Sequence, residues 1–144
     1  MQGFPHHYAV TATLGDDGVA LKSAGLPGLM TNAPAEFDGP GDQWSPETLL
    51  VGAIADCFIL TFKAVAAASK LDYQSIQCEV TGTLDRVDKQ TRFTSVTVAP
   101  TVTIRQEADR EKAVKLLHKT EENCLITNSM AVEVLLEAVV DCVS

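Results

Sequence analysis

The chain has 144 residues, enough for one domain with its own hydrophobic core. Acidic residues outnumber basic ones by 19 to 11, and the formal net charge is -8. Because binding to a phosphate backbone needs clustered cations, this balance and the lack of a basic stripe argue against a nucleic-acid partner. We therefore expect a single globular domain over residues 1–144.

The sequence also argues against a membrane protein and against a metal site. Its first ten residues lack the basic start and apolar segment of a signal peptide. Its one long apolar segment carries Asp56 and Lys63 near the middle, which makes a poor membrane span. The four cysteines form no CxxC pair, and no His–Cys spacing resembles a zinc site. We expect a cytoplasmic protein, where thiols stay reduced unless a disulfide is transient and catalytic.

The N-terminal part predicts a small hairpin followed by a long connection. Residues 8–13 alternate in polarity, residues 16–18 (Asp-Asp-Gly) are typical of a hairpin turn, and residues 19–21 would form the returning strand. Residues 23–43 are rich in glycine and proline, with one short strand predicted near Leu29. A loop of this length inside a compact domain is often functional.

A long apolar helix is predicted over residues 45–70. Ser45 is a good N-cap, Pro46 suits the first helical position, and Glu47 places a carboxylate in the first turn. A helix of about 25 residues is roughly 37 Å long, nearly the span of a small domain. Because this helix is apolar on almost every side, we expect it to be buried, with Cys57 near its middle.

The rest of the chain predicts strands around a second helix. Residues 71–87 and 93–104 indicate an antiparallel hairpin with one polar face, and Pro100 in the second strand indicates an edge or a bulge. Residues 107–123 predict an amphipathic helix, and residues 132–143 predict a last strand. The order of elements predicts an α+β fold in which helices cover a mostly antiparallel sheet.

Cys57 admits two interpretations. A lone cysteine in a buried helix most often fills a core position. Alternatively, Cys57 pairs with Cys124, at the end of the second predicted helix. A thiolate that attacks an O–O bond becomes a sulfenic acid, and a second thiol can then form a disulfide with it. Cys78, on the apolar face of a strand, is interpreted as a packing residue, and Cys142 is given no role.

Glu47 is ten residues before Cys57, so the two lie about 15 Å apart along a straight helix. Glu47 therefore reaches that thiol only if the helix breaks, for instance near Gly52, or if the contact comes from a second subunit. Its plain structural role is that of a first-turn carboxylate.

Two cysteine motifs resemble a known family. The segment SPETLL at residues 45–50 and the segment ADCF at residues 55–58 are similar to the Asn-Pro-Glu-x-Leu and Ala-x-Cys-Phe patterns of the OsmC/Ohr family, the osmotically inducible and organic hydroperoxide resistance proteins. The segment CLITNS at residues 124–129 falls where that family has Cys-Pro-x-Ser. The resemblance covers the chain from about Leu29 to its end, with the same order of elements.

The resemblance implies a thiol peroxidase for organic hydroperoxides. Cys57 would be the peroxidatic thiol, Cys124 the resolving thiol, and Glu47 an acidic orienting residue. The fold would be an intertwined homodimer with the long helices at its centre and two active sites at the subunit interface. No bound cofactor is implied, since an external dithiol such as a lipoylated protein would regenerate the thiols. Apolar neighbours of Cys57 would favour a fatty or aromatic hydroperoxide over hydrogen peroxide.

The chain departs from that family in one respect. Family members carry an arginine, from the N-terminal strands or the loop before the helix, that stabilises the thiolate. Residues 1–60 contain no arginine, and a buried thiol without a cation should have a raised pKa. Arg86, Arg92 or Arg105, on the later hairpin, would have to reach the site instead. Two alternatives therefore stay open: an apolar-ligand-binding or redox-sensing dimer without efficient peroxidase activity, and a structural dimer whose cysteines only pack.

Overall fold

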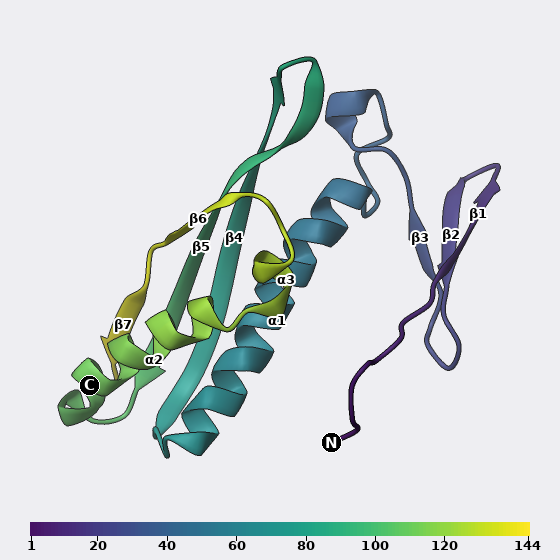
Figure 1. The fold of residues 1–144 in the computed structure, drawn as a ribbon. Coiled ribbons are helices and arrows are strands. Elements are labelled where there is room, and N and C mark those ends of the chain that lie inside the picture. Colours follow the sequence, from purple (N-terminus) through teal and green to yellow (C-terminus); the bar gives the residue numbers. More distant parts are fainter. The chain divides into compact units, whose positions relative to one another are not determined.

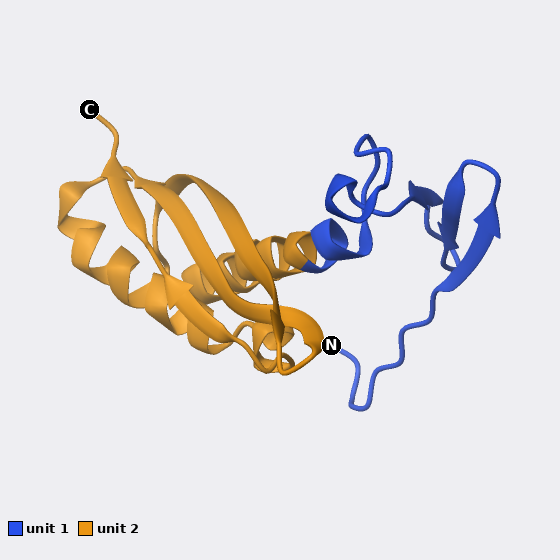
Figure 2. Ribbon diagram, turned by 90° about the horizontal axis from the view of Figure 1, so that it is seen from above, with its two compact units in different colours: residues 1–50 blue, residues 51–144 orange.

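The computed structural model describes all 144 residues, which gather into two compact units, residues 1–50 and residues 51–144 (Figure 2). The long helix α1 (Pro46–Ala68; Figure 1) begins in the first unit and continues through the second (Figure 2). Strands, long helix, strands, helices and strands follow one another, so the predicted α+β fold class is confirmed. That residues 1–144 form a single domain stays a prediction.

The first unit contains a three-stranded antiparallel sheet. Its strands β1 (Thr11–Gly15), β2 (Gly18–Lys22) and β3 (Leu29–Thr31) lie side by side in that order. The predicted hairpin turn and the short strand at Leu29 are confirmed. Gly18 has a φ of 128°, and a Cβ there would lie 2.4 Å from the carbonyl oxygen of Thr31, so the start of β2 requires glycine.

Ser45 and Thr48 close the start of α1 with reciprocal hydrogen bonds. The Thr48 N–H donates to Ser45 Oγ at 3.1 Å, and the Ser45 N–H donates to Thr48 Oγ1 at 2.8 Å. The Thr48 N–H is one of those that a helix start leaves without an intrahelical partner, so the pair satisfies it. The predicted cap at Ser45, with Pro46 as the first helical residue, is confirmed.

The second unit contains a mixed sheet centred on one long strand. Strands β4 (Tyr73–Val87) and β5 (Gln90–Ile104) form the predicted antiparallel hairpin. The last part of the chain forms two short strands, β6 (Glu133–Leu136) and β7 (Val139–Cys142), which both pair with β5 in parallel. The prediction of one last strand is therefore wrong, and β5 pairs with β4 in antiparallel orientation and with β6 and β7 in parallel.

Pro100 marks the place where the last strand is interrupted. The predicted edge or bulge is wrong, because β5 is paired on both sides and its register with β4 is regular at this residue. The Val98 carbonyl accepts a hydrogen bond from the N–H of Glu137, between β6 and β7, at 2.9 Å. Pro100, two residues later in β5, faces the same segment of the chain. Pro100 has no N–H to donate there, and the parallel pairing pauses between Val98 and Thr101.

Helix α1 packs on this sheet along a single stripe. Ile54, Phe58, Phe62 and Ala66 recur at every fourth residue and are almost wholly buried. The other sides of α1 are partly or fully exposed within one chain, and Leu60 is 57% exposed. We predicted that α1 is buried on almost every side, but within one chain it is buried only along this stripe. By length and composition alone α1 would also pass as a membrane span, although this stripe belongs to the core cluster of the protein.

Two further helices cover the same core. Helix α2 (Arg110–Glu122) follows a single 3₁₀ turn, η2 (Glu107–Asp109), and places Leu117 in the core beside the α1 stripe. The short helix α3 (Leu125–Asn128) comes directly after it, with Cys124 as the residue between the two. This junction fixes the position of the second candidate cysteine.

Candidate functional site

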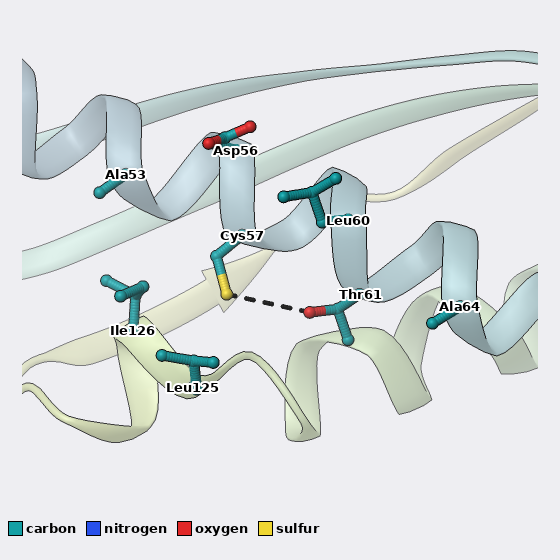
Figure 3. A pocket seen from close by; sticks show the side chains of 8 residues that line it. All are labelled: Ala53, Asp56, Cys57, Leu60, Thr61, Ala64, Leu125 and Ile126. Atoms are coloured by element: carbon teal, nitrogen blue, oxygen red, sulfur yellow. Dashed lines mark hydrogen bonds between the residues drawn. The ribbon is translucent and has the colours of Figure 1, made fainter. Parts of the chain in front are cut away.

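Cys57 lies on the side of α1 that is turned toward α3. Its neighbour Phe58 belongs to the buried stripe, and one step along a helix rotates a side chain by about 100°, so Cys57 stands beside the core. The sulfur points toward Leu125 and Ile126 at the start of α3 (Figure 3). Thr61, one turn further along α1, places its Oγ1 atom 3.8 Å from the Cys57 Sγ atom.

Cys124 lies between α2 and α3, where its backbone is hydrogen-bonded on both sides. Its N–H donates to the Glu121 carbonyl at 3.3 Å, and its carbonyl accepts from the Asn128 N–H at 3.0 Å. The Thr127 hydroxyl donates to the same carbonyl at 3.1 Å. The residue is 1% exposed, and its thiol lies near enough to the Cys57 sulfur to help lower the pKa of Cys57. Both cysteines are free thiols, so the chain brings the two predicted residues into one site without a disulfide between them.

The surroundings of Cys57 favour its thiolate. Burial raises the pKa of this thiol, but hydrogen bonds oppose burial and together hold the pKa below its ordinary value. The groups responsible, in decreasing order of effect, are the Ile126 N–H, the Cys124 thiol, the Thr61 hydroxyl and the Leu125 N–H. The raised pKa predicted for want of an arginine is therefore wrong. Two of the donors are N–H groups that the start of α3 leaves unpaired.

None of the four arginines lines the cavity at Cys57. Arg105 forms an ion pair with Asp72 at 3.2 Å, and Arg110 binds Glu107 and the carbonyl of Val140. Arg86 and Arg92 lie near the turn of the β4–β5 hairpin. The alternative that an arginine of the hairpin reaches the thiol is not realised within the chain, where backbone N–H groups lower the pKa of Cys57 instead.

Cys57 opens into a largely apolar cavity of about 530 Å³, whose lining also includes the carboxylate residue Asp56 (Figure 3). The wall on α1 includes Ala53, Leu60 and Ala64, and the wall on α3 is formed by Leu125 and Ile126. A cavity of this size and lining suits a small, largely apolar ligand. The sulfur of Cys57 is thus accessible to such a ligand, whereas that of Cys124 is buried.

Glu47 lies elsewhere, in a cavity formed by residues 1–50. It belongs to the first turn of α1, and its Oε1 atom is buried without a hydrogen-bond partner. The helix runs unbroken from Pro46 to Ala68, so the conceivable break at Gly52 is absent. Glu47 does not line the cavity at Cys57.

The other two cysteines are unsuited to act as nucleophiles. Cys78 lies on the inner side of β4, where burial, together with the nearby charge of Cys124, raises its pKa to about 11. Burial and a hydrogen bond with Glu107 raise the pKa of Cys142 as well. Both thiols stay protonated at neutral pH, in keeping with the packing role inferred for Cys78.

Sequence reasoning missed Leu125, Ile126 and Thr61 as partners of the thiolate. Backbone N–H groups leave no mark in a sequence, so Leu125 and Ile126 could not be recognised by residue type. One signal was present: the motif at Cys124 has leucine where the family pattern has proline, so this chain keeps an N–H there. No group of His, Cys, Asp and Glu is arranged to hold a metal ion.

Comparisons with known proteins point to one family. The model of the family described as OsmC-like protein matches residues 39–138. Among curated relatives, an uncharacterized protein of Bacillus subtilis (strain 168), YmaD, is 32% identical over 110 residues, which is 73% of each chain.

Solved structures share the fold at low sequence identity. An OsmC-like protein of unknown function from Vibrio cholerae has a TM-score of 0.85 at 21% identity, over 94% of this chain and 100% of that one. An organic hydroperoxide resistance protein OsmC from Legionella pneumophila has a TM-score of 0.78 at 22% identity, over 95% and 99% of the two chains. Another organic hydroperoxide resistance protein, from Elizabethkingia anophelis, has a TM-score of 0.78 at 17% identity, over 99% and 100%.

Proposed function

The chain belongs to the OsmC-like protein family, and we propose that it is a cysteine-based peroxidase that reduces organic hydroperoxides. One observation carries the proposal. Two free thiols, distant in sequence, lie near each other beside an apolar cavity, and the more accessible one has a pKa that its neighbours, Cys124 among them, hold below the ordinary value. Similar folds named as organic hydroperoxide resistance proteins support the choice of substrate class.

The first step uses Cys57 as the peroxidatic thiol. Its thiolate attacks one oxygen of the hydroperoxide, an S–O bond forms, and the O–O bond breaks. The sulfur is oxidised to a sulfenic acid, and the organic fragment leaves as an alkoxide that takes up a proton and becomes an alcohol. The N–H groups of Leu125 and Ile126 and the Thr61 hydroxyl lower the pKa of Cys57 and so raise the fraction of the attacking thiolate.

The second step uses Cys124 as the resolving thiol. Its sulfur attacks the sulfenic sulfur of Cys57, an S–S bond forms, the S–O bond breaks, and the oxygen leaves as water. One hydroperoxide and two thiols thus give one alcohol, one water and one disulfide. An external dithiol, of which a lipoyl group is one example, then reduces the disulfide by two thiol–disulfide exchanges.

The proposal keeps Glu47 as a positioning residue, with a hydrogen-bond donor as its partner. A buried carboxylate oxygen without a hydrogen-bond partner lowers the stability of the folded protein. The unpaired Oε1 atom of Glu47 therefore supports the view that its donor comes from a group outside this chain. Since Glu47 and Cys57 line different cavities, its role in the thiol chemistry requires a second copy of the chain or the ligand itself.

A homodimer is part of the proposal. Helix α1 exposes apolar residues on the sides that the core leaves free, and Leu60 is the clearest case at 57% exposed. Such a surface on a helix of 23 residues is typical of an element that is covered by another chain. The two-fold arrangement with α1 at the centre is the one that the family resemblance implies.

The test of the function is a turnover assay with matched substrates. The reduced protein, supplied with dihydrolipoamide, should consume cumene hydroperoxide faster than hydrogen peroxide, because only the former fills the apolar cavity. Cys57→Ser should abolish turnover, whereas Cys78→Ser should leave it near that of the unaltered chain. Equal turnover by Cys57→Ser and the unaltered chain would refute the assignment.

The second candidate function is an apolar-ligand-binding or redox-sensing dimer. It is favoured by one observation, the lack of any arginine at the thiol. Native mass spectrometry that shows a co-purified apolar ligand, together with a Cys57 that does not react with cumene hydroperoxide, would select this function over the peroxidase.

A further inference from the structure

One charged side chain lies among the apolar walls of the Cys57 cavity. Asp56, the residue before Cys57 on α1, lines that cavity, and no other acidic or basic residue does. The family pattern Ala-x-Cys-Phe leaves this position open, so the carboxylate is a feature of this chain rather than of the pattern. The proposed thiol chemistry gives Asp56 no role, and its effect on the bound molecule is therefore a separate question.

No cation of the chain neutralises Asp56 within the cavity. Its side chain is exposed and belongs to none of the three ion pairs of the chain. Lys63 is the only basic residue of α1, but it lies seven residues further along, about 10 Å away along the helix axis, and does not line the cavity. Because an aspartate is negatively charged at neutral pH, the cavity presents a negative charge to any molecule that enters it.

The carboxylate of Asp56 and the sulfur of Cys57 point in different directions. Neighbouring side chains on a helix are rotated by about 100° from each other. Figure 3 shows the Cys57 sulfur turned toward α3 and the Asp56 carboxylate turned away from it. Asp56 is also absent from the groups that shift the pKa of Cys57. The charge is therefore placed to act on the bound molecule rather than on the thiolate.

We propose that Asp56 is a specificity-determining residue, which favours neutral hydroperoxides at Cys57 over hydroperoxides that carry a carboxylate. Two negative charges in one small cavity repel each other, and the repulsion is stronger where water is partly excluded. The other walls, formed by residues such as Leu60, Leu125 and Ile126, supply no cation that would offset it. This inference rests on the proposed function and narrows its substrate class to uncharged organic hydroperoxides, such as aromatic hydroperoxides and those of fatty-acid esters.

The first test measures the charge preference of the site without any peroxide. Iodoacetamide and iodoacetate are nearly equal in size and both alkylate a thiolate, but only iodoacetate is negatively charged. The rate of each reagent at Cys57 is followed in the full, reduced chain by mass spectrometry of the labelled peptides. Asp56→Asn should raise the ratio of the iodoacetate rate to the iodoacetamide rate by roughly three- to tenfold, because the repulsion is lost.

A matched variant and a change of salt separate a local charge from the net charge of the chain. Asp88→Asn removes the same charge from an exposed turn residue that does not line the cavity, and asparagine tolerates the positive φ of that position. It should leave the ratio unchanged. Raising the salt from about 0.1 M to about 1 M shortens the Debye length from about 10 Å to about 3 Å, so the unaltered chain should discriminate less between the two reagents.

The second test uses two hydroperoxides that share one hydrocarbon chain, those of linoleic acid and of methyl linoleate. With dihydrolipoamide as the reductant, the unaltered chain should have the higher kcat/KM for the ester. Asp56→Asn should raise kcat/KM for the acid by roughly three- to tenfold, mainly through a lower KM, because the repulsion acts on binding.

The two tests fail in different ways. Absence of turnover with either hydroperoxide, together with a raised alkylation ratio in Asp56→Asn, would refute the proposed function and leave the charge preference of the cavity in place. Equal alkylation ratios in the unaltered chain and Asp56→Asn would overturn the role of Asp56, even if both chains reduce hydroperoxides. The same rise in Asp88→Asn as in Asp56→Asn would overturn it too. Should Asp56→Asn not fold, a ratio in the unaltered chain that does not respond to salt would decide against the inference.

Discussion

Cys57 and Thr61 lie one turn apart on α1, with the Sγ and Oγ1 atoms separated by 3.8 Å (Figure 3). The hydroxyl is one of four groups that favour the thiolate of Cys57. Because each can be removed separately, the way in which this chain activates a thiol without an arginine can be tested group by group.

Thr61→Val removes the hydroxyl and keeps the shape of the side chain. The pKa of Cys57 should rise, so that less thiolate is present at pH 7, and alkylation of Cys57 by iodoacetamide should slow by roughly two- to tenfold. Mass spectrometry of the labelled peptides assigns the rate to Cys57. Thr61→Ser, which keeps the hydroxyl, should react at the original rate; equal rates for the two variants would show that the hydroxyl does not act on the thiolate.

Leu125→Pro removes one N–H donor and brings proline to the first position of α3, where a helix tolerates it. The pKa of Cys57 should rise, and the plateau of its alkylation rate should move to higher pH, because only the thiolate reacts. Leu125→Ala is the matched control, since it also removes the leucine side chain but retains the N–H. If both variants gave the same pH profile, the backbone donor would have no part in the activation.

Much of this fold is predictable from local chemistry. The Ser45 cap, the turn before Gly18 and the alternation of Ile76, Cys78 and Val80 each follow from the residues themselves and appear as predicted. The two parallel strands after residue 132 were not predictable in the same way. Their separation depends on Pro100, which lies in another strand, and a sequence does not reveal which strands become neighbours.

The site was only partly predictable for a similar reason. Two cysteine motifs indicated Cys57 and Cys124, which the structure brings together, and Glu47, which it places in another cavity. The stabilising N–H groups belong to whichever backbone meets the sulfur, so no residue type reveals them. The sequence shows that residues 1–60 contain no arginine. Which groups stabilise the thiolate of Cys57 instead depends on the tertiary structure.

Cys78 should make the stability of the protein fall at alkaline pH. Its pKa is about 11 in the folded chain and about 8.5 in an unfolded one, so between these values the unfolded state binds fewer protons than the folded state. Stability contributed by the neutral thiol is therefore complete below about pH 8.5 and is lost as the pH rises toward 11. Urea unfolding at pH 8 and pH 10 measures this loss.

Comparison with Cys78→Ala isolates the contribution of this thiol from those of other groups that titrate at high pH. The free energy of unfolding should fall more between the two pH values in the unaltered chain than in the variant. Equal falls would mean that Cys78 ionises as readily in the folded protein as in the unfolded one.

Leu60→Asp tests the proposed dimer. Leu60 is 57% exposed on the free side of α1, and a charge there should weaken a dimer formed through this helix by about 2 kcal/mol or more, roughly thirtyfold in the dissociation constant. Analytical ultracentrifugation should find the unaltered chain dimeric and the variant shifted toward monomer. Leu84→Asp, an exposed leucine of β4, is the control and should stay dimeric. A variant at Leu60 that dimerises like the unaltered chain would place the interface elsewhere.

The most direct measurement is a single turnover without external dithiol. One equivalent of cumene hydroperoxide is added to the fully reduced protein, free thiols are counted, and the peptides are mapped by mass spectrometry. The account predicts the loss of two thiols, the release of one equivalent of cumyl alcohol, and one disulfide that joins Cys57 to Cys124. Recovery of both cysteines as free thiols after exposure to the hydroperoxide would contradict it.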